Sequence, residues 1–335
     1  MALVPMRILL DAAKKGTYAV GAFNVNNMEQ IQAIMAAARE MKSPVIIQAS
    51  RGALKYSNLI YLKHLMLAAV EENPDIPVAM HLDHGNSLDT VKMAIGLGFT
   101  SVMIDGSLKE DSKTPTTFEE NLDITRRVID YARPLGVTVE AELGTLGGIE
   151  DGVGSGTVNL TDPDQAEEFV AKTNVDALAV AIGTSHGAYK FKEEPKLALG
   201  LVKEINRRLP DTALVMHGSS SVPQELVDIV NRYGGRMPNA RGVPMTAIRS
   251  VIPWGVRKVN VDTDGRIAIT GAIRKVFAES PEKFDPRDYL KPARDALAAL
   301  VAGKMRELGA AGHAGEIEQK SLEDMKAFYR DRGLV

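Results

Sequence analysis

The chain has 335 residues, of which 45% are apolar and 25% are charged, and its formal net charge is −3. This is the balance of an ordinary globular domain, and so small a charge predicts no nucleic-acid partner and no attraction to an anionic membrane. The absence of cysteine excludes disulfides and thiolate metal sites, so a transition metal would need histidine and carboxylate ligands. No apolar run approaches the ~18 residues of a membrane span, and we expect a cytoplasmic protein.

The first fifteen residues predict a helix and not a signal peptide, because Arg7 and Asp11 interrupt their apolar stretch. Eight short runs rich in Val, Ile and Ala then follow along the chain. They begin at Tyr18, Ser43, Ile76, Thr100, Gly136, Asp176, Thr212 and Val256. Helical patterns lie between them, for example over residues 27–41 and over 223–233, where Pro223 suits the first helical position.

The eight runs are nearly continuous in apolar residues, as expected of parallel strands that are covered on both faces. Eight strand–helix units within roughly 250 residues predict an α/β fold, the (β/α)₈ or TIM barrel. A doubly wound sheet is the alternative, but the first strand–helix turn lacks the G-x-G-x-x-G fingerprint of its cofactor site.

Two segments depart from the strand–helix repeat. The stretch after the fifth run carries six glycines between Gly144 and Gly156, which predicts a mobile lid. About seventy residues follow Asp264 and are helical in pattern. We therefore expect one domain over 1–335, with the barrel over about 1–270 and a helical extension over about 271–335 that caps the barrel or reaches a neighbouring subunit.

Polar side chains gather where the predicted strands end, which is where barrels place their active sites. They are Asn24, Asn26, Ser50, Asp83, His84, Asp105, Glu140, Glu142, His186, His217, Asn260 and Asp262. A single histidine there is more often structural, but three on separate strands predict a zinc site with one position left open for substrate. We interpret His84, His186 and His217 as the ligands, and His81, deeper in its strand, as a hydrogen-bonded core residue.

For the neighbouring carboxylates the residues alone allow more than one role. Asp83 is either a group that orients the site or a general acid–base. Glu142 and Asp105 are either alternative metal ligands or partners of the ligands, and Glu150 lies in the glycine-rich loop. Backbone amides and hydroxyls of Gly218–Ser221, just before Pro223, predict either an anion cradle or a simple serine-rich N-cap, and their position after the seventh strand favours a phosphate site. The residues therefore indicate a metal-dependent enzyme that acts on a small phosphorylated carbonyl compound.

The motifs "AFNVNN", "HLDHG", "MIDGS", "EAELGTLGGIEDG", "IGTSHGAYKF", "HGSSSVP", "VRKVNVDTD" and "FDPRDY" follow one another in this order. With them the chain resembles the class II, zinc-dependent fructose-1,6-bisphosphate aldolases over nearly its full length. The resemblance implies a reversible aldol cleavage to dihydroxyacetone phosphate and glyceraldehyde 3-phosphate. It matches His84, His186 and His217 to the zinc ligands, Asp83 to the acid–base, and Glu150 to the loop carboxylate that moves the proton at the nucleophilic carbon.

The resemblance also implies the positions that surround the metal and the substrate. Glu142 and Asp105 match an alternative zinc position or a second divalent cation, and Gly187, Gly218 and Ser220 match a site for a monovalent cation, Na⁺ or K⁺. The dihydroxyacetone-phosphate pocket is matched by Gly218, Ser220, Asn260, Asp262 and Thr263, with Lys190 nearby. Groups around the sugar chain and the far phosphate are matched by Asn24, Ser50, Arg266, Asp285 and Arg287.

Two positions depart from the family pattern. Ile149 stands where one branch has a second loop glutamate, which places this chain with the other branch, whose members are usually tetramers, and we expect a tetramer rather than a dimer. Residues 108–116, "LKEDSKTPT", are longer than expected, and the sequence assigns them no role. Tagatose-1,6-bisphosphate cleavage, a zinc-dependent barrel hydrolase and a non-catalytic sugar-phosphate binder are the alternative functions.

Overall fold

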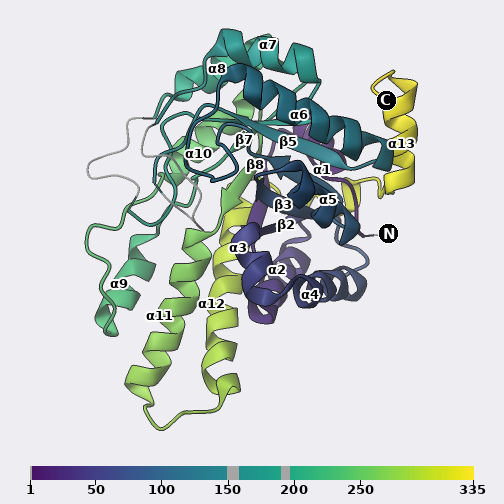
Figure 1. Ribbon diagram of the computed structural model, residues 1–335. Coiled ribbons are helices and arrows are strands. Elements are labelled where there is room, and N and C mark those ends of the chain that lie inside the picture. Colours follow the sequence, from purple (N-terminus) through teal and green to yellow (C-terminus); the bar gives the residue numbers. More distant parts are fainter. Residues whose placement is uncertain (1, 149–157, 190–196) are drawn as a thin grey trace.

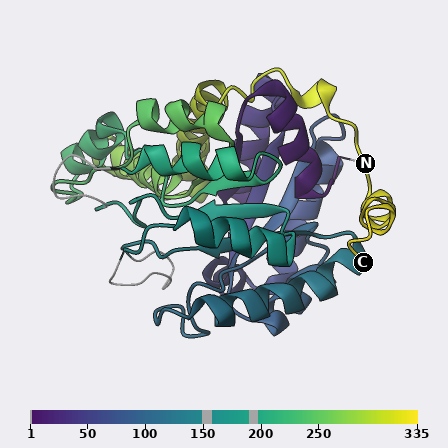
Figure 2. The same ribbon diagram turned by 90° about the horizontal axis from the view of Figure 1, so that it is seen from above.

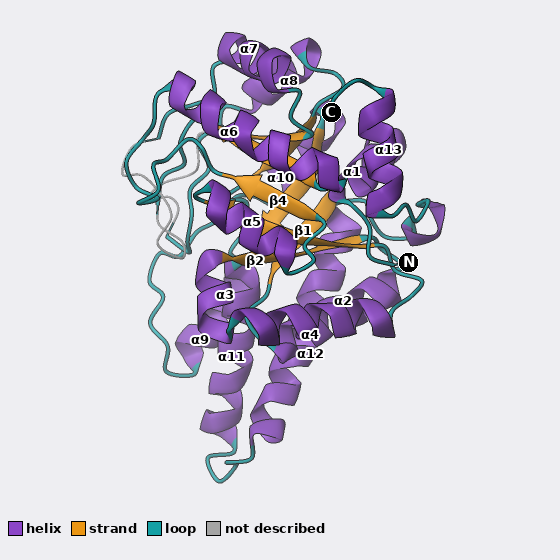
Figure 3. Ribbon diagram, turned by 45° about the vertical axis from the view of Figure 1, so that its right-hand side comes forward, coloured by secondary structure: helices purple, strands orange, loops and turns teal. Residues whose placement is uncertain are grey.

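The computed structural model describes residues 2–148, 158–189 and 197–335, and in it each of the eight predicted runs forms a parallel strand. The strands close into a barrel in sequence order, with β8 paired to β1 through Val20 and Lys258, which confirms the (β/α)₈ fold (Figure 3). Their bounds are β1 Val20–Asn24, β2 Val45–Ser50, β3 Val78–Gly85, β4 Ser101–Ile104, β5 Thr138–Leu143, β6 Ala177–Val180, β7 Ala213–Met216 and β8 Val256–Val261.

Helices surround the strands, and local capping sets where several of them begin (Figure 1). Their bounds are α1 Met6–Gly16, α2 Met28–Met41, α3 Arg51–Ser57, α4 Leu59–Glu72, α5 Leu88–Gly96, α6 Phe118–Ala132, α7 Pro163–Thr173, α8 Leu199–Arg208, α9 Gln224–Arg232, α10 Met245–Val251, α11 Thr263–Glu279, α12 Pro286–Glu307 and α13 Leu322–Asp331. Thr117 and Glu120 form a capping box that begins α6. Pro223 is the N-cap of α9, one position before the predicted one.

Side chains within each strand alternate between the barrel interior and the surrounding helices, because successive residues of a strand point to opposite faces. Ile47, Met80 and Val139 belong to the outer core between strands and helices. Ala22, Ile46, Ala79 and Val215 instead form an inner cluster together with buried side chains of α1. Helix α1 thus closes the amino-terminal end of the barrel, and the opposite end, where the strands finish, is left open.

A buried ion-pair network fastens α1 and α13 to this closed end. The Asp176 carboxylate, fully shielded from solvent, accepts hydrogen bonds from Arg7 Nη1 at 2.8 Å, the Val139 amide at 2.9 Å and the Tyr329 hydroxyl at 3.0 Å. Burial lowers the pKa of Arg7, but the charges of Asp176 and Asp11 outweigh this and raise it. Figure 2 shows the two chain ends on the same side of the molecule.

The predicted carboxy-terminal extension begins inside α11. Helices α11 and α12 form a hairpin that projects from the barrel, while α12 also packs along α2 and touches β1 (Figure 1). His64 lies on α4, whereas His313 lies in the turn that follows α12, where its ring stacks on Tyr18 with centroids 4.3 Å apart. No helix among the described residues is long and apolar enough to cross a membrane.

We predict that Asp176→Ala destabilises the protein by ~3–5 kcal/mol, because it leaves the buried Arg7 guanidinium without its carboxylate. Urea unfolding followed by circular dichroism measures this change. The matched control is Asp211→Ala, which removes the partner of Lys14 on the same helix from a pair that is 95% exposed at the carboxylate. That variant should unfold at the same urea concentration as the wild type. Equal losses of stability in the two variants would contradict the role given to Asp176.

Candidate active site

A pocket opens at the carboxyl ends of the strands, where the sequence predicted the site. Ten described residues line it: Asn24, Ser50, Asp83, His84, His186, Gly218, Ser219, Ser220, Asn260 and Asp262. Of these, Ser219 alone was not among the predicted site residues. The remaining nine come from six different strands or the turns that follow them, which is how a barrel brings distant segments to one mouth.

Asp83 lies at the floor of this pocket and is held by three amide side chains. Its Oδ2 accepts hydrogen bonds from Asn24 Nδ2 at 3.0 Å and Gln48 Nε2 at 3.2 Å, and its Oδ1 accepts one from Asn260 Nδ2 at 3.3 Å. Burial alone would raise the pKa of Asp83, but the charges of His84 and His217 with the Asn24 hydrogen bond hold it below its ordinary value. The carboxylate is therefore ionised and fixed in orientation.

His84 follows Asp83 in an unusual backbone conformation. The pairing of β3 with β4 shifts register between Leu82 and Gly85, and His84 lies within this irregularity with φ at 49°. A left-handed backbone costs a non-glycine residue ~1–2 kcal/mol, and such bulges commonly re-aim a side chain beside an active site. Here the turn lets consecutive residues, Asp83 and His84, both reach the same pocket.

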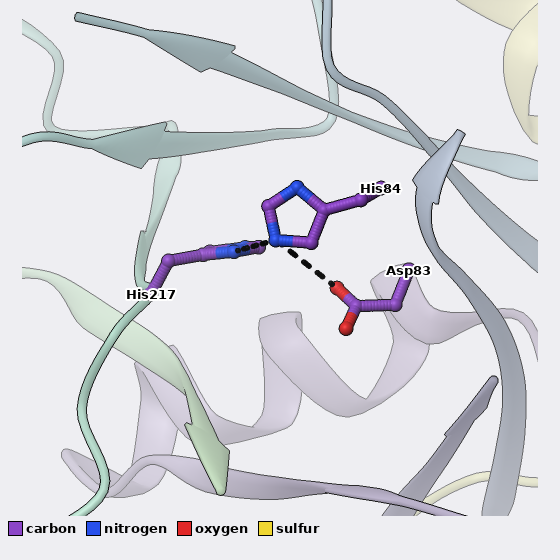
Figure 4. Close-up of side chains that lie close together, drawn as sticks. All are labelled: Asp83, His84 and His217. Carbon is purple, nitrogen blue, oxygen red and sulfur yellow. Dashed lines mark hydrogen bonds and ion pairs between the residues drawn. The ribbon is translucent and has the colours of Figure 1, made fainter. Parts of the chain in front are cut away.

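The rings of His84 and His217 meet edge to face, with centroids 4.8 Å apart, and His84 Nε2 lies 3.1 Å from His217 Nδ1 (Figure 4). The His186 ring also meets His84 edge to face, at 5.2 Å. Ligand atoms within 4.8 Å of one another form two groups among the described residues, Asp83–His84–His217 and His84–Asp105–Glu142. The structure thus brings the three predicted histidines together around His84: His84 and His186 line the pocket, and His217, which does not line it, packs against His84.

The outer nitrogens of two of these histidines bond to carboxylates. His84 Nδ1 lies 3.1 Å from Asp105 Oδ2, and His217 Nε2 lies 2.8 Å from Glu140 Oε1. Each neutral ring that donates to its carboxylate keeps a lone pair on the other nitrogen, and these two nitrogens are the pair that face each other at 3.1 Å. When both rings are neutral, their lone pairs repel at that distance, and a bound cation would relieve the repulsion.

The charge around the histidines also fits a metal. Asp83, Asp105, Glu140 and Glu142 are all buried, and the described lysine Lys258, 3.0 Å from Glu140, offsets one of these charges. Glu142 Oε2 is buried and accepts no hydrogen bond from the described residues. Burial first, and then Asp105, raise the pKa of Glu142 well above its ordinary value. A divalent cation would relieve this crowding, so the donor set suits zinc.

Without a bound cation, these surroundings shift the pKa values of His84 and His217 in opposite directions. Burial would lower the pKa of His84, but the Asp83 and Asp105 carboxylates outweigh it and raise the pKa to about 10. Burial and the His84 charge together lower the pKa of His217 well below its ordinary value.

His81 is fully buried with its Nδ1 2.6 Å from Ser101 Oγ, which agrees with the core role expected of it.

The predicted anion cradle follows β7. Gly218 has φ of 60°, and a Cβ there would lie 2.8 Å from the Ser185 carbonyl oxygen, so only glycine fits this turn. The next turn is fixed by Asp264, which accepts hydrogen bonds from the Ser221 amide at 3.0 Å and the Val222 amide at 2.7 Å. Lys304 of α12 lies 2.7 Å from Asp264, and this buried pair ties the cradle to the carboxy-terminal helices.

On the other side of the cradle, Asp262 and Thr263 begin α11. Asp262 binds Arg266 through two bonds, Nε to Oδ1 at 2.8 Å and Nη2 to Oδ2 at 2.6 Å. The Ser220 hydroxyl accepts a hydrogen bond from the Asp262 amide at 3.3 Å. Gly187, with φ of 82°, follows His186 directly. The segments predicted to bind phosphate, and Gly187, predicted at the monovalent-cation site, therefore all follow the carboxyl ends of β6, β7 and β8.

Two predicted site residues fall outside the described part of the chain, and two others lie away from the strand ends. Glu150 and Lys190 lie outside the described residues, as does Ile149. Asp285 and Arg287 lie where α12 begins, at the end of the projecting hairpin, and pair with each other through Arg287 Nη2 and Asp285 Oδ2 at 2.5 Å. The Arg287 side chain is 89% exposed and lines a separate groove between α2 and α12.

The sequence did not predict five residues that contact and orient the site residues or the turn after β7: Gln48, Arg51, Lys258, Asp264 and Lys304. Three of them carry a signal that could have found them. Gln48 and Lys258 stand two residues before the strand-end positions Ser50 and Asn260, so period-two alternation puts them on the same interior face. Asp264 stands two residues after Asp262. Arg51 and Lys304 have no such signal.

Known proteins are similar to this chain over nearly its whole length. The family described as "Fructose-bisphosphate aldolase class-II" matches residues 4–313. A fructose-bisphosphate aldolase of Giardia intestinalis is 58% identical, over 98% of this chain and all of that protein, and one of Nostoc commune is 55% identical over 98% and 96%. Among solved structures, the YdjI aldolase of Escherichia coli K12 is similar with a TM-score of 0.75 and 30% identity, over 93% of this chain and 99% of that one.

We predict that Glu140→Gln weakens Zn²⁺ binding by ~10–100-fold, because the outer partner of His217 loses the charge that makes the imidazole a stronger ligand. Competition with a chromophoric chelator measures the affinity. Glu140→Gln also leaves Lys258 buried and unpaired, which lowers stability. The double variant Glu140→Gln/Lys258→Met should regain stability but not zinc affinity. Wild-type affinity in either variant would show that Glu140 does not act on the metal site.

Proposed function

Because the chain belongs to the class II fructose-bisphosphate aldolase family, it is a lyase that cleaves fructose 1,6-bisphosphate to dihydroxyacetone phosphate and glyceraldehyde 3-phosphate, and we propose the residues that carry this reaction. His84, His186 and His217 are proposed to hold zinc, and Asp83 to act as the acid–base. The observation that carries the proposal is the convergence of His84 Nε2, His217 Nδ1 and Asp83 within one buried group. Zinc, when bound there, supplies a Lewis acid for the ketone oxygen of the substrate.

Asp83 is suited to take a proton because its amide partners fix it while leaving it ionised. In cleavage it removes the proton from the hydroxyl next to the breaking carbon–carbon bond, and the bonding electrons pass to the dihydroxyacetone-phosphate fragment. Glu150 then delivers a proton to the carbon that carried those electrons. In the reverse direction each residue performs the opposite transfer. Asn24 and Asn260, which bond Asp83, keep it aimed at the substrate hydroxyl.

The phosphates are proposed to bind on either side of this centre. Gly218, Ser220, Asn260, Asp262 and Thr263, with Lys190, form the dihydroxyacetone-phosphate pocket, since their turns present backbone amides next to the start of α11. Asn24, Ser50 and Arg266 face the sugar chain. Gly187, Gly218 and Ser220 hold a monovalent cation, Na⁺ or K⁺. Glu142 and Asp105 offer an alternative position for zinc or a place for a second divalent cation.

The far phosphate is proposed to be bound by a second copy of the chain. Arg287 is exposed at the end of the hairpin and absent from the pocket lining of its own chain. It is suited to a phosphate because its planar fork can donate to two oxygens. A homo-oligomer, a tetramer rather than a dimer, would bring this arginine and Asp285 to a neighbouring site. A cytoplasmic location is proposed as well, in keeping with a chain that has no cysteine.

We predict that Asp83→Ala lowers kcat by the ~10²–10⁴-fold typical of a lost acid–base while KM and zinc content change little. His217→Ala should instead lose zinc and activity together. A coupled assay for triose phosphate release gives the kinetics, and atomic absorption gives the metal content. Loss of zinc from Asp83→Ala would make Asp83 a structural part of the metal site.

The control for this experiment is wild-type protein treated with a chelator, which should lose activity and regain it with added Zn²⁺. Borohydride added with substrate should trap no adduct, because the reaction needs no Schiff base with a lysine. A covalent lysine adduct would overturn the proposed mechanism. A hydrolase or a sugar-phosphate binder would release no triose phosphate at all.

We predict that Arg287→Ala raises KM for the bisphosphate by ~10–100-fold, the worth of a charged hydrogen bond. Proton exchange on dihydroxyacetone phosphate should persist, because that fragment lacks the far phosphate.

Asp285→Ala should narrow the preference for fructose 1,6-bisphosphate over tagatose 1,6-bisphosphate. The reason is that Asp285 would accept a hydrogen bond from the hydroxyl whose configuration distinguishes the two sugars. Lys291→Ala, another paired cation of α12, is the control. An active monomer would contradict the shared site.

A further inference from the structure

Arg51, the first residue of α3, connects the backbone of His84 to a loop that the sequence left without a role. Its Nε donates to the His84 carbonyl oxygen at 3.2 Å, and its Nη2 donates to Ser112 Oγ at 2.5 Å. Ser112 is buried, with 4% of its surface exposed. The guanidinium therefore joins three segments that are separate in the chain: the start of α3, the end of β3 and the loop between β4 and α6.

The β4–α6 loop, residues 105–117, is built to hold Ser112 in one place. Leu108 and Pro115 pair as an antiparallel bridge, and the Ser112 amide donates to the Lys109 carbonyl oxygen at 2.7 Å. Ser112 has φ of 58°. The Asp111 carboxylate accepts hydrogen bonds from the Lys113 and Thr114 amides at 2.8 and 2.9 Å, which fixes the tip.

The same loop reaches His84 at both its ring and its backbone. At the first end, Ser107 Oγ donates to Asp105 Oδ1 at 2.6 Å, and Asp105 Oδ2 lies 3.1 Å from His84 Nδ1. At the tip, Ser112 holds Arg51, which holds the His84 carbonyl oxygen. A further bond runs from Asn86 Nδ2 to the Glu110 carbonyl oxygen at 2.6 Å. The β4–α6 loop thus holds both the imidazole and the backbone carbonyl group of His84 through hydrogen bonds.

His84 needs such a hold more than an ordinary strand residue does. Its left-handed backbone is disfavoured, and residues in such conformations persist only where their surroundings fix them. If the carbonyl group of His84 turned, the ring would swing away from His217. Arg51 is half-buried beside Asp105, and burial lowers its pKa while the Asp105 charge opposes that effect. Its two hydrogen bonds, to His84 and to Ser112, are therefore partly shielded from water, which strengthens their hold on the geometry.

We propose that Arg51, held by Ser112 of the β4–α6 loop, is a positioning residue for the metal centre that fixes His84 in the backbone conformation needed to bind zinc. The inference deepens the proposed function and rests on it, because it takes His84 as a zinc ligand. It gives residues 108–116 a role: they keep the guanidinium on the His84 carbonyl oxygen. The loop acts on metal affinity and not on contacts with the sugar phosphate.

The test measures zinc affinity by chelator competition in the full-length protein. Arg51→Met keeps the length of the side chain, removes its donors and should weaken Zn²⁺ binding by ~10–100-fold. Ser112→Ala should act in the same direction by ~2–10-fold, the worth of one hydrogen bond. The double variant should bind zinc no more weakly than Arg51→Met, because Ser112 acts through Arg51. Lys55→Met, which removes an exposed cation from the same helix, should bind zinc as the wild type does.

Two further readouts separate positioning from a loss of structure or of substrate contact. Guanidinium chloride, below denaturing concentrations, should restore part of the zinc affinity of Arg51→Ala, which general destabilisation would not allow. At saturating Zn²⁺, KM for fructose 1,6-bisphosphate should equal that of the wild type in Ser112→Ala and Arg51→Met. A raised KM with unchanged zinc affinity would mean that Arg51 binds the substrate, and would overturn the proposal.

The outcomes also distinguish this proposal from the proposed function. Wild-type protein that binds no zinc, or a His217→Ala variant that keeps it, would overturn the zinc site itself. Wild-type protein that binds zinc while Arg51→Met and Ser112→Ala bind it equally well would overturn the role of Arg51 alone. If Arg51→Met does not fold, Ser112→Ala decides the question, since it removes only one hydroxyl and leaves the guanidinium in place.

Discussion

The site depends on the attraction between buried carboxylates and two facing imidazoles. Each histidine gives one nitrogen to a carboxylate, His84 to Asp105 and His217 to Glu140, and so turns its other nitrogen toward the same point. Removing charged groups from water is costly, and it is tolerated here because the charges of opposite sign lie within hydrogen-bonding distance. Lys258 beneath Glu140 extends this compensation into the barrel. The members of this polar interior therefore depend on one another, and the proposed divalent ion would complete its charge balance.

The closed barrel makes that arrangement possible by sorting side chains into layers. Period-two alternation directs one set of strand residues inward, and their character changes along the strand axis. Ala79 meets α1 at the closed end, His81 lies above it in the charged middle layer, and Asp83 faces the pocket. The intervening residues, such as Met80 and Leu82, face the helices and are apolar. One strand thus serves the outer core, the inner support and the chemistry at the same time.

Most of the fold and much of the pocket could be predicted from the sequence, because both depend on local patterns. Apolar runs identified all eight strands, and their carboxyl ends identified the polar residues that meet there. The parts that could not be predicted arise from contacts between segments far apart in the chain. Nothing near Arg51 indicates that it reaches His84, and nothing near Lys304 indicates its pairing with Asp264. The left-handed backbone of His84 was also hidden, since it follows from a register shift between two strands.

The closed end of the barrel gathers both chain ends away from the pocket. Leu3 pairs with Val78 at the start of β3, and Tyr329 of α13 bonds Asp176 just before β6, so each terminal segment is anchored where strands begin. The pocket lies where the strands end. A fluorescent label, a surface linker or a fused domain attached at either terminus would therefore leave the path of the substrate open. The same anchoring makes this barrel suited to immobilisation on a solid support with its mouth facing the solution.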